Sequence, residues 1–180
     1  MDLKIAYIPE DRKTLALDLR AKISDNVALV NLDELCNGLG FVNKASEGAL
    51  CRKQKDRFRI KTPSMALPAN SLSGGNQQKV VLAKWLARDV DVLILDEPTR
   101  GIDVGSKEEI HRLIVELARE GKAIIMISSE LPEVLGMSDR ILVMYEGRLM
   151  GILDAREADQ ETVMAHLVGS PKQKEAQANA

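Results

Sequence analysis

Two short stretches of this chain carry residue types that suit phosphate and water chemistry, and one helix length separates them. The first is Ser73-Gly74-Gly75, where glycines let the backbone approach an anion and the serine can cap the helix that follows. A helix N-terminus carries about half a positive charge and free N–H groups, which together suit a phosphate. The second stretch is Asp96-Glu97, which places two carboxylates at the end of an apolar run.

The two carboxylates favour different roles. Asp96 ends the expected strand, a position from which a carboxylate can hold Mg²⁺ through water. Glu97 follows and could be the general base for an attacking water, which contributes typically about 10² to 10⁴ in rate. Asp103 lies in the next loop and could reach across an interface. Alone, each stretch is also consistent with a plain capped helix or an ordinary turn, but their order and spacing favour the chemical interpretation.

A phosphate-cradling loop of the form Gly, four residues, Gly-Lys-Ser/Thr occurs nowhere in the 180 residues. Residues 101–107 resemble such a loop superficially. The gap there is three residues, however, the Ser-Lys order is reversed, and the segment follows the carboxylates instead of preceding them. We therefore reject these residues as a phosphate loop.

Composition argues against several function classes. The formal net charge is −2 and only 3% of the residues are aromatic, so neither a basic field nor a stacking platform for nucleic acid is expected. The first residues do not resemble a signal sequence, and no apolar run approaches the ~20 residues of a membrane span. Any connection to a membrane is therefore expected to run through a partner.

The cysteines and histidines form no recognisable catalytic or metal-binding set. Cys36 and Cys51 do not form a Cys-x-x-Cys pair, so we expect two free thiols that pack as small apolar side chains. His111 and His166 are expected at a surface or a helix end, because His111 lies within a charged helical segment and His166 is near the C-terminus.

Hydrophobic periodicity predicts an α/β fold with a mainly parallel sheet. The apolar runs 3–8, 92–95 and 123–127 are expected to be strands, the last two of them buried. Helices are expected from Ser73 to about Arg88, over 106–120 with Gly121 as the C-cap, over 130–135 and over 159–168, with a hairpin formed by 141–145 and 148–152.

The same pattern suggests how the chain is organised. Ligands of such folds sit beyond the carboxyl ends of the strands, where Asp96, Glu97 and Ser128-Ser129 fall. The segment from about 14 to 75 shows no alternation of strand and helix, so it is expected to be a helical subdomain inserted before an α/β core at about 76–169. Residues 1–169 would form one partial domain, and the polar tail 170–180 is expected to be disordered.

Several motifs together, in this order, resemble those of the ATP-binding cassette (ABC) superfamily. Residues 72–79 are similar to its signature motif, 93–99 to its Walker B strand with the catalytic glutamate, and 101–103 to its D-loop. The sequences of residues 7–12, 74–79, 98–105 and 128–133 are similar to those of the ATPases of bacterial ribose- and galactose-type sugar importers, and in particular to their second cassette. The resemblance covers residues 3 to about 169.

The resemblance implies a P-loop-NTPase-like fold with ATP and Mg²⁺ as cofactors. The family's phosphate loop would precede residue 1, so we expect a module truncated at its N-terminus that binds ATP poorly alone. Two cassettes of this family sandwich ATP between them. By resemblance, Ser73, Gly74, Gly75 and Gln77 would contact the ATP that the opposite cassette holds.

The remaining site residues are also implied by the resemblance. Asp96 would hold the metal and Glu97 would be catalytic for the nucleotide of the chain's own cassette, with Asp103 at the interface. Glu10 stands where the family usually has its Q-loop glutamine, and Ser129 stands where it has its switch histidine. Both replacements are typical of the second cassette of the sugar importers.

The implied partners are a second ABC cassette, transmembrane permease subunits that the segment 14–70 would contact, and indirectly a sugar-binding protein, with no nucleic acid. The implied location is the cytoplasmic face of the inner membrane, as a peripheral subunit. Two functions stay open: a portion of a sugar-importing ATPase, and a non-catalytic module that supplies its signature turn in trans to an intact cassette. An ABC-type ATPase of DNA repair, chromosome maintenance or translation is disfavoured, because zinc-type cysteine pairs, coiled-coil heptads and a basic linker are missing.

Overall fold

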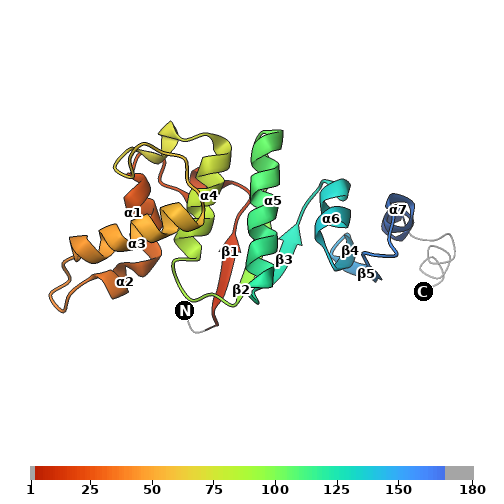
Figure 1. The fold of residues 1–180 in the computed structure, drawn as a ribbon. Coiled ribbons are helices and arrows are strands. Elements are labelled where there is room, and N and C mark those ends of the chain that lie inside the picture. The colour runs from red at the N-terminus through yellow and green to blue at the C-terminus, as the bar shows by residue number, and fades with distance from the viewer. Residues whose placement is uncertain (1–2, 169–180) are drawn as a thin grey trace. The chain divides into compact units, whose positions relative to one another are not determined.

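The computed structural model describes residues 3–168, which form two compact units that divide between Ile127 and Ser128 (Figure 1). The first unit holds a parallel sheet and most of the helices. The second unit holds a β-hairpin between two short helices.

The sheet of the first unit has three parallel strands in the order β1 (Ile5–Ile8), β2 (Val92–Asp96) and β3 (Ala123–Ile127). The register pairs Ile8 with Leu95, and Asp96 with Ile127. All three strands therefore end at one edge of the sheet, which is also where Asp96 lies. The predicted α/β class with a mainly parallel sheet is confirmed.

The two faces of this sheet differ in burial. Ala6, Ile8, Leu93 and Leu95 are fully buried on the face that α4 (Gly74–Trp85) and α5 (Val104–Arg119) cover. The opposite face presents exposed apolar side chains, namely Ile5, Tyr7, Ile125 and Ile127. The prediction that 123–127 is a buried strand is therefore wrong: β3 is an edge strand of the described sheet, and every second side chain points away from the helices.

Helices fill the chain between β1 and α4. They are a π-helical turn, Arg12–Ala16, followed by α1 (Ile23–Ala28), a 3₁₀ turn at Leu29–Asn31, α2 (Leu32–Leu35), α3 (Lys44–Arg57) and a 3₁₀ turn at Ala69–Ser71. Ile23, Val27 and Phe58 form their buried core. Both cysteines are free thiols, as expected, and burial raises the pKa of Cys51 to about 11, so this thiol stays protonated and unreactive at neutral pH.

The helices α4 and α5 run side by side against the sheet (Figure 1). The predicted apolar stripe of α5 is confirmed, because all four of its members are at most 5% exposed: Ile110, Leu113, Ile114 and Leu117. Gly121, at φ +89°, follows the last turn of α5 in the left-handed conformation that ends many helices. The helix α4 ends at Trp85, three residues before the expected boundary at Arg88.

The second unit consists of α6 (Leu131–Met137), β4 (Arg140–Tyr145), β5 (Arg148–Asp154) and α7 (Gln160–Val168). The strands pair antiparallel around a two-residue turn, Glu146-Gly147, in which both residues have positive φ. The predicted hairpin and flanking helices are confirmed, whereas the expected disordered tail lies outside the described residues. Over residues 3–168, none of the helices has both the length and the apolar character that a membrane crossing requires.

The packing of α5 against the sheet yields a test of the core. Replacing Ile110, which is 0% exposed, with alanine should lower the free energy of unfolding by about 2–5 kcal/mol, because a cavity replaces buried methyl groups. Val115→Ala on the exposed side of the same helix is the control and should change it by less than about 1 kcal/mol. Urea titration of both variants measures the difference, and equal losses would contradict this placement of α5.

Candidate functional site

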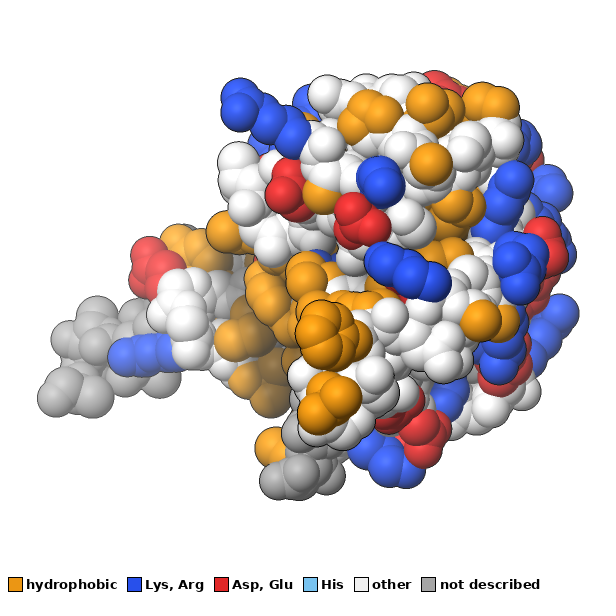
Figure 2. Space-filling model, turned by 90° about the vertical axis from the view of Figure 1, so that its left-hand side faces the viewer, with side chains coloured by type: hydrophobic (Ala, Val, Ile, Leu, Met, Phe, Trp, Pro, Cys, Tyr) orange, Lys and Arg blue, Asp and Glu red, His pale blue; other side chains and the backbone are white. Residues whose placement is uncertain are grey.

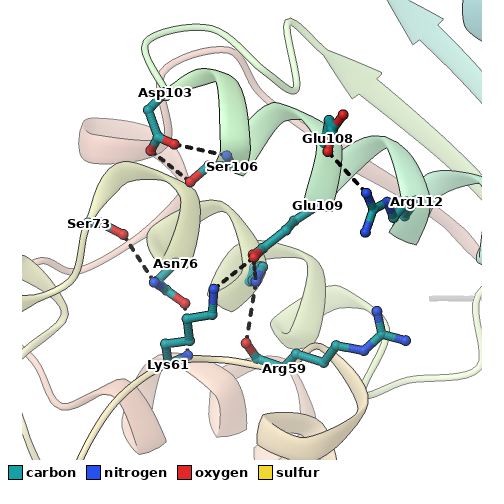
Figure 3. A network of polar contacts seen from close by, with 10 residues as sticks. Arg59, Lys61, Ser73, Asn76, Asp103, Ser106, Glu108, Glu109 and Arg112 are labelled. Carbon is teal, nitrogen blue, oxygen red and sulfur yellow. Dashed lines mark hydrogen bonds and ion pairs between the residues drawn. The ribbon is translucent and has the colours of Figure 1, made fainter.

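The beginnings of α4 and α5 touch at Gly75. A Cβ atom added to Gly75 would lie 2.4 Å from Ser106 Oγ and 2.5 Å from Ser106 Cβ. Only a residue without a side chain permits this approach. The second glycine of the motif therefore has a packing role, and it brings the turn at Ser73 close to the loop that carries Asp103 (Figure 3).

Ser73 occupies the N-cap position of α4, but its hydroxyl makes no capping hydrogen bond. The expectation that the Ser73 side chain caps the helix is wrong, because Asn76 supplies a competing donor: Asn76 Nδ2 donates to Ser73 Oγ at 3.0 Å. The oxygen of the same amide accepts from the backbone N of Lys61 at 2.8 Å, which fixes its orientation. The side chain of Ser73 is exposed and accepts no hydrogen bond from the first N–H groups of α4.

The other signature residues lie inside the turn. Gln77 is 6% exposed, and its Nε2 donates to the carbonyl oxygens of Leu72 at 3.2 Å and Ala69 at 3.4 Å. Its side chain therefore braces the turn from within, and contact between Gln77 and a nucleotide stays a prediction. Gly74 faces the loop after β2, since a Cβ added there would lie 3.3 Å from the carbonyl oxygen of Gly101.

The carboxylates lie at the edge of the sheet, as the strand pattern predicted. Asp96 Oδ2 accepts a hydrogen bond of 2.7 Å from the hydroxyl of Tyr7 on the neighbouring strand β1, and this bond raises the pKa of Tyr7. Glu97 has φ +48°, an uncommon conformation for a residue with a side chain. Its N–H donates to Ile127 O at 2.9 Å and its carbonyl accepts from Arg100 N at 3.1 Å, so the surroundings hold it in this strained geometry. Such strain is frequent where a side chain must be aimed.

The remaining predicted residues differ in how they are held. Asp103 caps α5, with Oδ1 accepting from Ser106 N at 2.9 Å and Oδ2 from Ser106 Oγ at 2.7 Å, and these bonds lower the pKa of Asp103. The carboxylate of Glu10 pairs with the guanidinium of Arg100. Ser129 follows β3 and belongs to the second unit, and its role at the site stays a prediction.

An ion-pair network around the buried Lys79 joins α4 to α5, and sequence reasoning missed it. Lys79 Nζ contacts Glu109 Oε2 at 2.5 Å and the carbonyl oxygen of Arg59 at 3.3 Å, while Lys61 Nζ contacts Glu109 Oε1 at 2.7 Å (Figure 3). The bonds from Lys61 and Lys79 lower the pKa of Glu109 to about 2. The available signal was a lysine directly before the buried run Val80–Ala83, where a charge needs a partner.

The comparisons with known proteins agree with this fold. A family model described as ABC transporter matches residues 2–100. This match covers more than half of the chain, and the chain therefore belongs to the ABC transporter family.

Two relatives show which members of the family are similar in sequence to this chain. A Rhizobium etli protein named for ribose/galactose/methyl galactoside import ATP binding is 54% identical over 92% of this chain and 31% of its own length. The ribose import ATP-binding protein RbsA of Shouchella clausii is 49% identical over 93% of this chain and 34% of its own length. The chain thus spans about a third of the length of these curated relatives.

A solved structure supports the fold independently. The ATP-binding cassette MJ0796, in a dimeric post-hydrolysis state bound to ADP and Pi, superposes with a TM-score of 0.68 over 86% of this chain and 64% of its own. The sequence identity is only 21%, so the likeness concerns the fold alone.

The network at Glu109 yields a stability test. Glu109→Gln should lower the free energy of unfolding at pH 7 by about 2 kcal/mol, because it leaves the buried Lys79 ammonium without its counter-charge. The expected loss is smaller than the ~3–5 kcal/mol that breaking a fully buried ion pair costs, because the Glu109 side chain is 38% exposed. Its folded pKa, about 2, lies below the ordinary 4.5, so the contribution is complete above pH ~4.5 and disappears as the pH falls towards 2.

Glu108→Gln is the matched control, because Glu108 makes only an exposed i,i+4 pair with Arg112. Urea titrations between pH 3 and pH 7 should show a gap between the two variants that narrows on acidification. A gap that is absent at pH 7, or independent of pH, would contradict the assigned role of Glu109.

The contact at Gly75 yields a second test. Gly75→Ala should lower the free energy of unfolding by about 1–3 kcal/mol, because the new methyl group overlaps Ser106 and forces the helix starts apart. Gly105→Ala is the control, since a Cβ there meets only Asp103 Oδ1 at an ordinary 3.5 Å. Adding Ser106→Gly should recover part of the loss in a double-mutant cycle. Additive losses would contradict direct overlap.

Proposed function

We propose that this chain acts as part of the ATPase of a sugar importer, where it supplies a signature turn and the carboxylates that end β2. The similarity to ribose and galactoside import ATP-binding proteins over more than nine-tenths of the chain supports this proposal. The observation that carries it is local: an exposed Ser73 lies at a helix start that packs against the loop of Asp103, while strained Glu97 follows Asp96 at the sheet edge.

The donor set around Asp96 fits a magnesium ion that arrives with a nucleotide. Mg²⁺ keeps several waters and takes one or two carboxylates together with phosphate oxygens, so one strand-end carboxylate is sufficient. Among residues 3–168 there is no group of three or more His, Cys, Asp or Glu that could form an all-protein cage. Asp96 would hold the ion and Tyr7 would orient the Asp96 carboxylate through its hydroxyl. When bound, Mg²⁺ neutralises charge on the phosphates.

Glu97 is the proposed general base of this strand. Its backbone is held at both sides, by Ile127 and by Arg100, which fixes the direction from which its side chain leaves the sheet. A carboxylate adjacent to the metal ligand can accept a proton from an attacking water, which is the role that the position of Glu97 suits.

The signature turn is proposed to act in trans, on a nucleotide held by a second cassette. Ser73 is exposed, and the N–H groups of a helix start behind it can bind phosphate oxygens. The 180 residues contain no phosphate-loop sequence, so turnover by the chain alone should be negligible. The same observations favour the alternative of a non-catalytic module that completes the site of an intact cassette.

Membrane partners are proposed to contact the helices between β1 and α4. Figure 2 views the molecule from the side of α2 and α3, and hydrophobic side chains gather there beside basic ones. Leu29, Leu32, Leu39 and Phe41 are exposed in this part of the chain. These residues suit a permease subunit at the cytoplasmic face of the inner membrane, with a sugar-binding protein as an indirect partner.

The decisive experiment uses the purified chain with an intact cassette from a ribose-type importer. Mg-ATP should induce a complex of the two, and Ser73→Arg should abolish it by blocking the turn. Ser46→Arg is the control, because Ser46 is an exposed serine on α3. The absence of an ATP-dependent complex with the unmodified chain would overturn the proposal. Turnover by the chain alone that Glu97→Gln abolishes would disprove the need for a second cassette.

A further inference from the structure

Arg12 is a buried cation that the proposed chemistry does not use. It follows β1 at the start of the π-helical turn Arg12–Ala16 and is only 7% exposed. Its Nη1 donates to the carbonyl oxygen of Arg100 at 2.8 Å, and its Nη2 donates to that of Gly101 at 3.3 Å. The guanidinium therefore binds the loop that joins the carboxylates of β2 to Asp103.

A second bond links the same two segments in the opposite direction. The guanidinium of Arg100 pairs with the carboxylate of Glu10, at the surface beside the buried contact. The backbone N–H of Arg100 also donates to the carbonyl of Glu97. The position of Arg100 is thus tied both to the loop after β1 and to the residue proposed as general base.

Arg12 also contacts the signature turn. A Cβ atom added to Gly74 would lie 3.0 Å from Arg12 Nη2 and 3.2 Å from Ile102 Cγ2. Gly74 therefore packs directly on the guanidinium and on the side chain that precedes Asp103. Three segments meet at this one cation: the loop after β1, the loop after β2, and the start of α4.

The energetics favour a positioning role over a purely stabilising one. Burial lowers the pKa of Arg12, and the negative charge of Asp11 opposes this shift without cancelling it. Its Nε has no hydrogen-bond partner among the described residues. Burying a charge in this way is costly, and an apolar side chain of similar size would cost less. The guanidinium offers what an apolar side chain does not, namely a rigid fork that binds two successive carbonyls at once.

We propose that Arg12 is a positioning residue that fixes the loop between Glu97 and Asp103 against Gly74. The signature turn, Asp103 and the loop of Glu10 then keep one relative placement before any partner binds. Arg12 acts through this loop in the proposal, by its bonds to the carbonyls of Arg100 and Gly101. The consequence for assembly with a second cassette rests on the proposed function, whereas the effect on the loop does not.

The loop is tested first, by hydrogen exchange on the chain alone. Arg12→Gln and Arg12→Lys should speed amide exchange across residues 99–103 by roughly tenfold, the factor expected when charged hydrogen bonds to a loop are lost. The lysine variant keeps the charge and the stem, so its effect isolates the fork. Arg20→Gln, at an exposed arginine of the same segment, is the control and should leave exchange unchanged.

The site is tested next, in the complex with the intact cassette. Arg12→Gln should lower the kcat of ATP turnover roughly tenfold and leave the KM for Mg-ATP within about twofold, because placement is lost and ground-state nucleotide binding is not. Arg12→Lys should recover less than half of the kcat that Arg12→Gln loses. Exchange of α3 amides over 44–57 reports whether the fold itself is intact.

The outcomes separate the two proposals. If the unmodified chain forms no complex, the proposed function fails, and exchange at 99–103 still tests Arg12 by itself. If amide exchange across residues 99–103 is no faster in the Arg12 variants than in Arg20→Gln, the positioning role is overturned. Faster exchange in α3 as well would also overturn it, since Arg12 would then merely support the fold. Full activity of Arg12→Gln in a functioning complex would overturn the consequence for the site.

Discussion

The close approach of α4 and α5 at Gly75 is the constraint on which the rest of the site depends. A glycine there lets the two helix starts touch, and touching helices bury the side chain of Lys79 between them. A buried ammonium requires a counter-charge, which Glu109 supplies from α5. One steric contact and one ion pair thus hold the helix starts that carry Ser73 and Asp103 together.

The sheet edge is organised by a different kind of interaction. The strands β1 and β2 are neighbours, so a tyrosine from one can donate to the carboxylate that ends the other. Glu97, the residue after that carboxylate, adopts a left-handed backbone conformation. Backbone hydrogen bonds to Ile127 of β3 and to Arg100 in its own turn maintain this conformation. The carboxylates proposed to act at this edge thus lie at the end of a paired strand, and Arg12 connects the loop after them to the signature turn. Sites supported in this way hold their geometry better than sites on free loops.

The chain belongs to the ABC transporter family and is similar to sugar-import ATP-binding proteins, and the proposed function interprets the site geometry on that basis. The chain spans about a third of those relatives, so the proposed activity concerns what this part contributes. The proposed contribution is an exposed turn and a carboxylate pair, together with a helical segment that has exposed apolar side chains. The roles of the predicted site residues in nucleotide handling stay predictions, those of Gln77, Glu10 and Ser129 included.

The sequence by itself determined the α/β class, the amphipathic α5, the hairpin and the order of the motifs, because each depends on local periodicity or turn chemistry. It predicted wrongly that Ser73 caps α4 and that β3 is buried. Both depend on groups that are distant in the sequence: the N–H of Lys61 orients the Asn76 amide that bonds Ser73, and helices cover only one face of the sheet. The contacts Tyr7–Asp96, Lys79–Glu109 and Arg12–Gly101 join residues 30 to 89 positions apart. Only the tertiary structure decided them, because no local pattern specifies which distant group meets a buried charge.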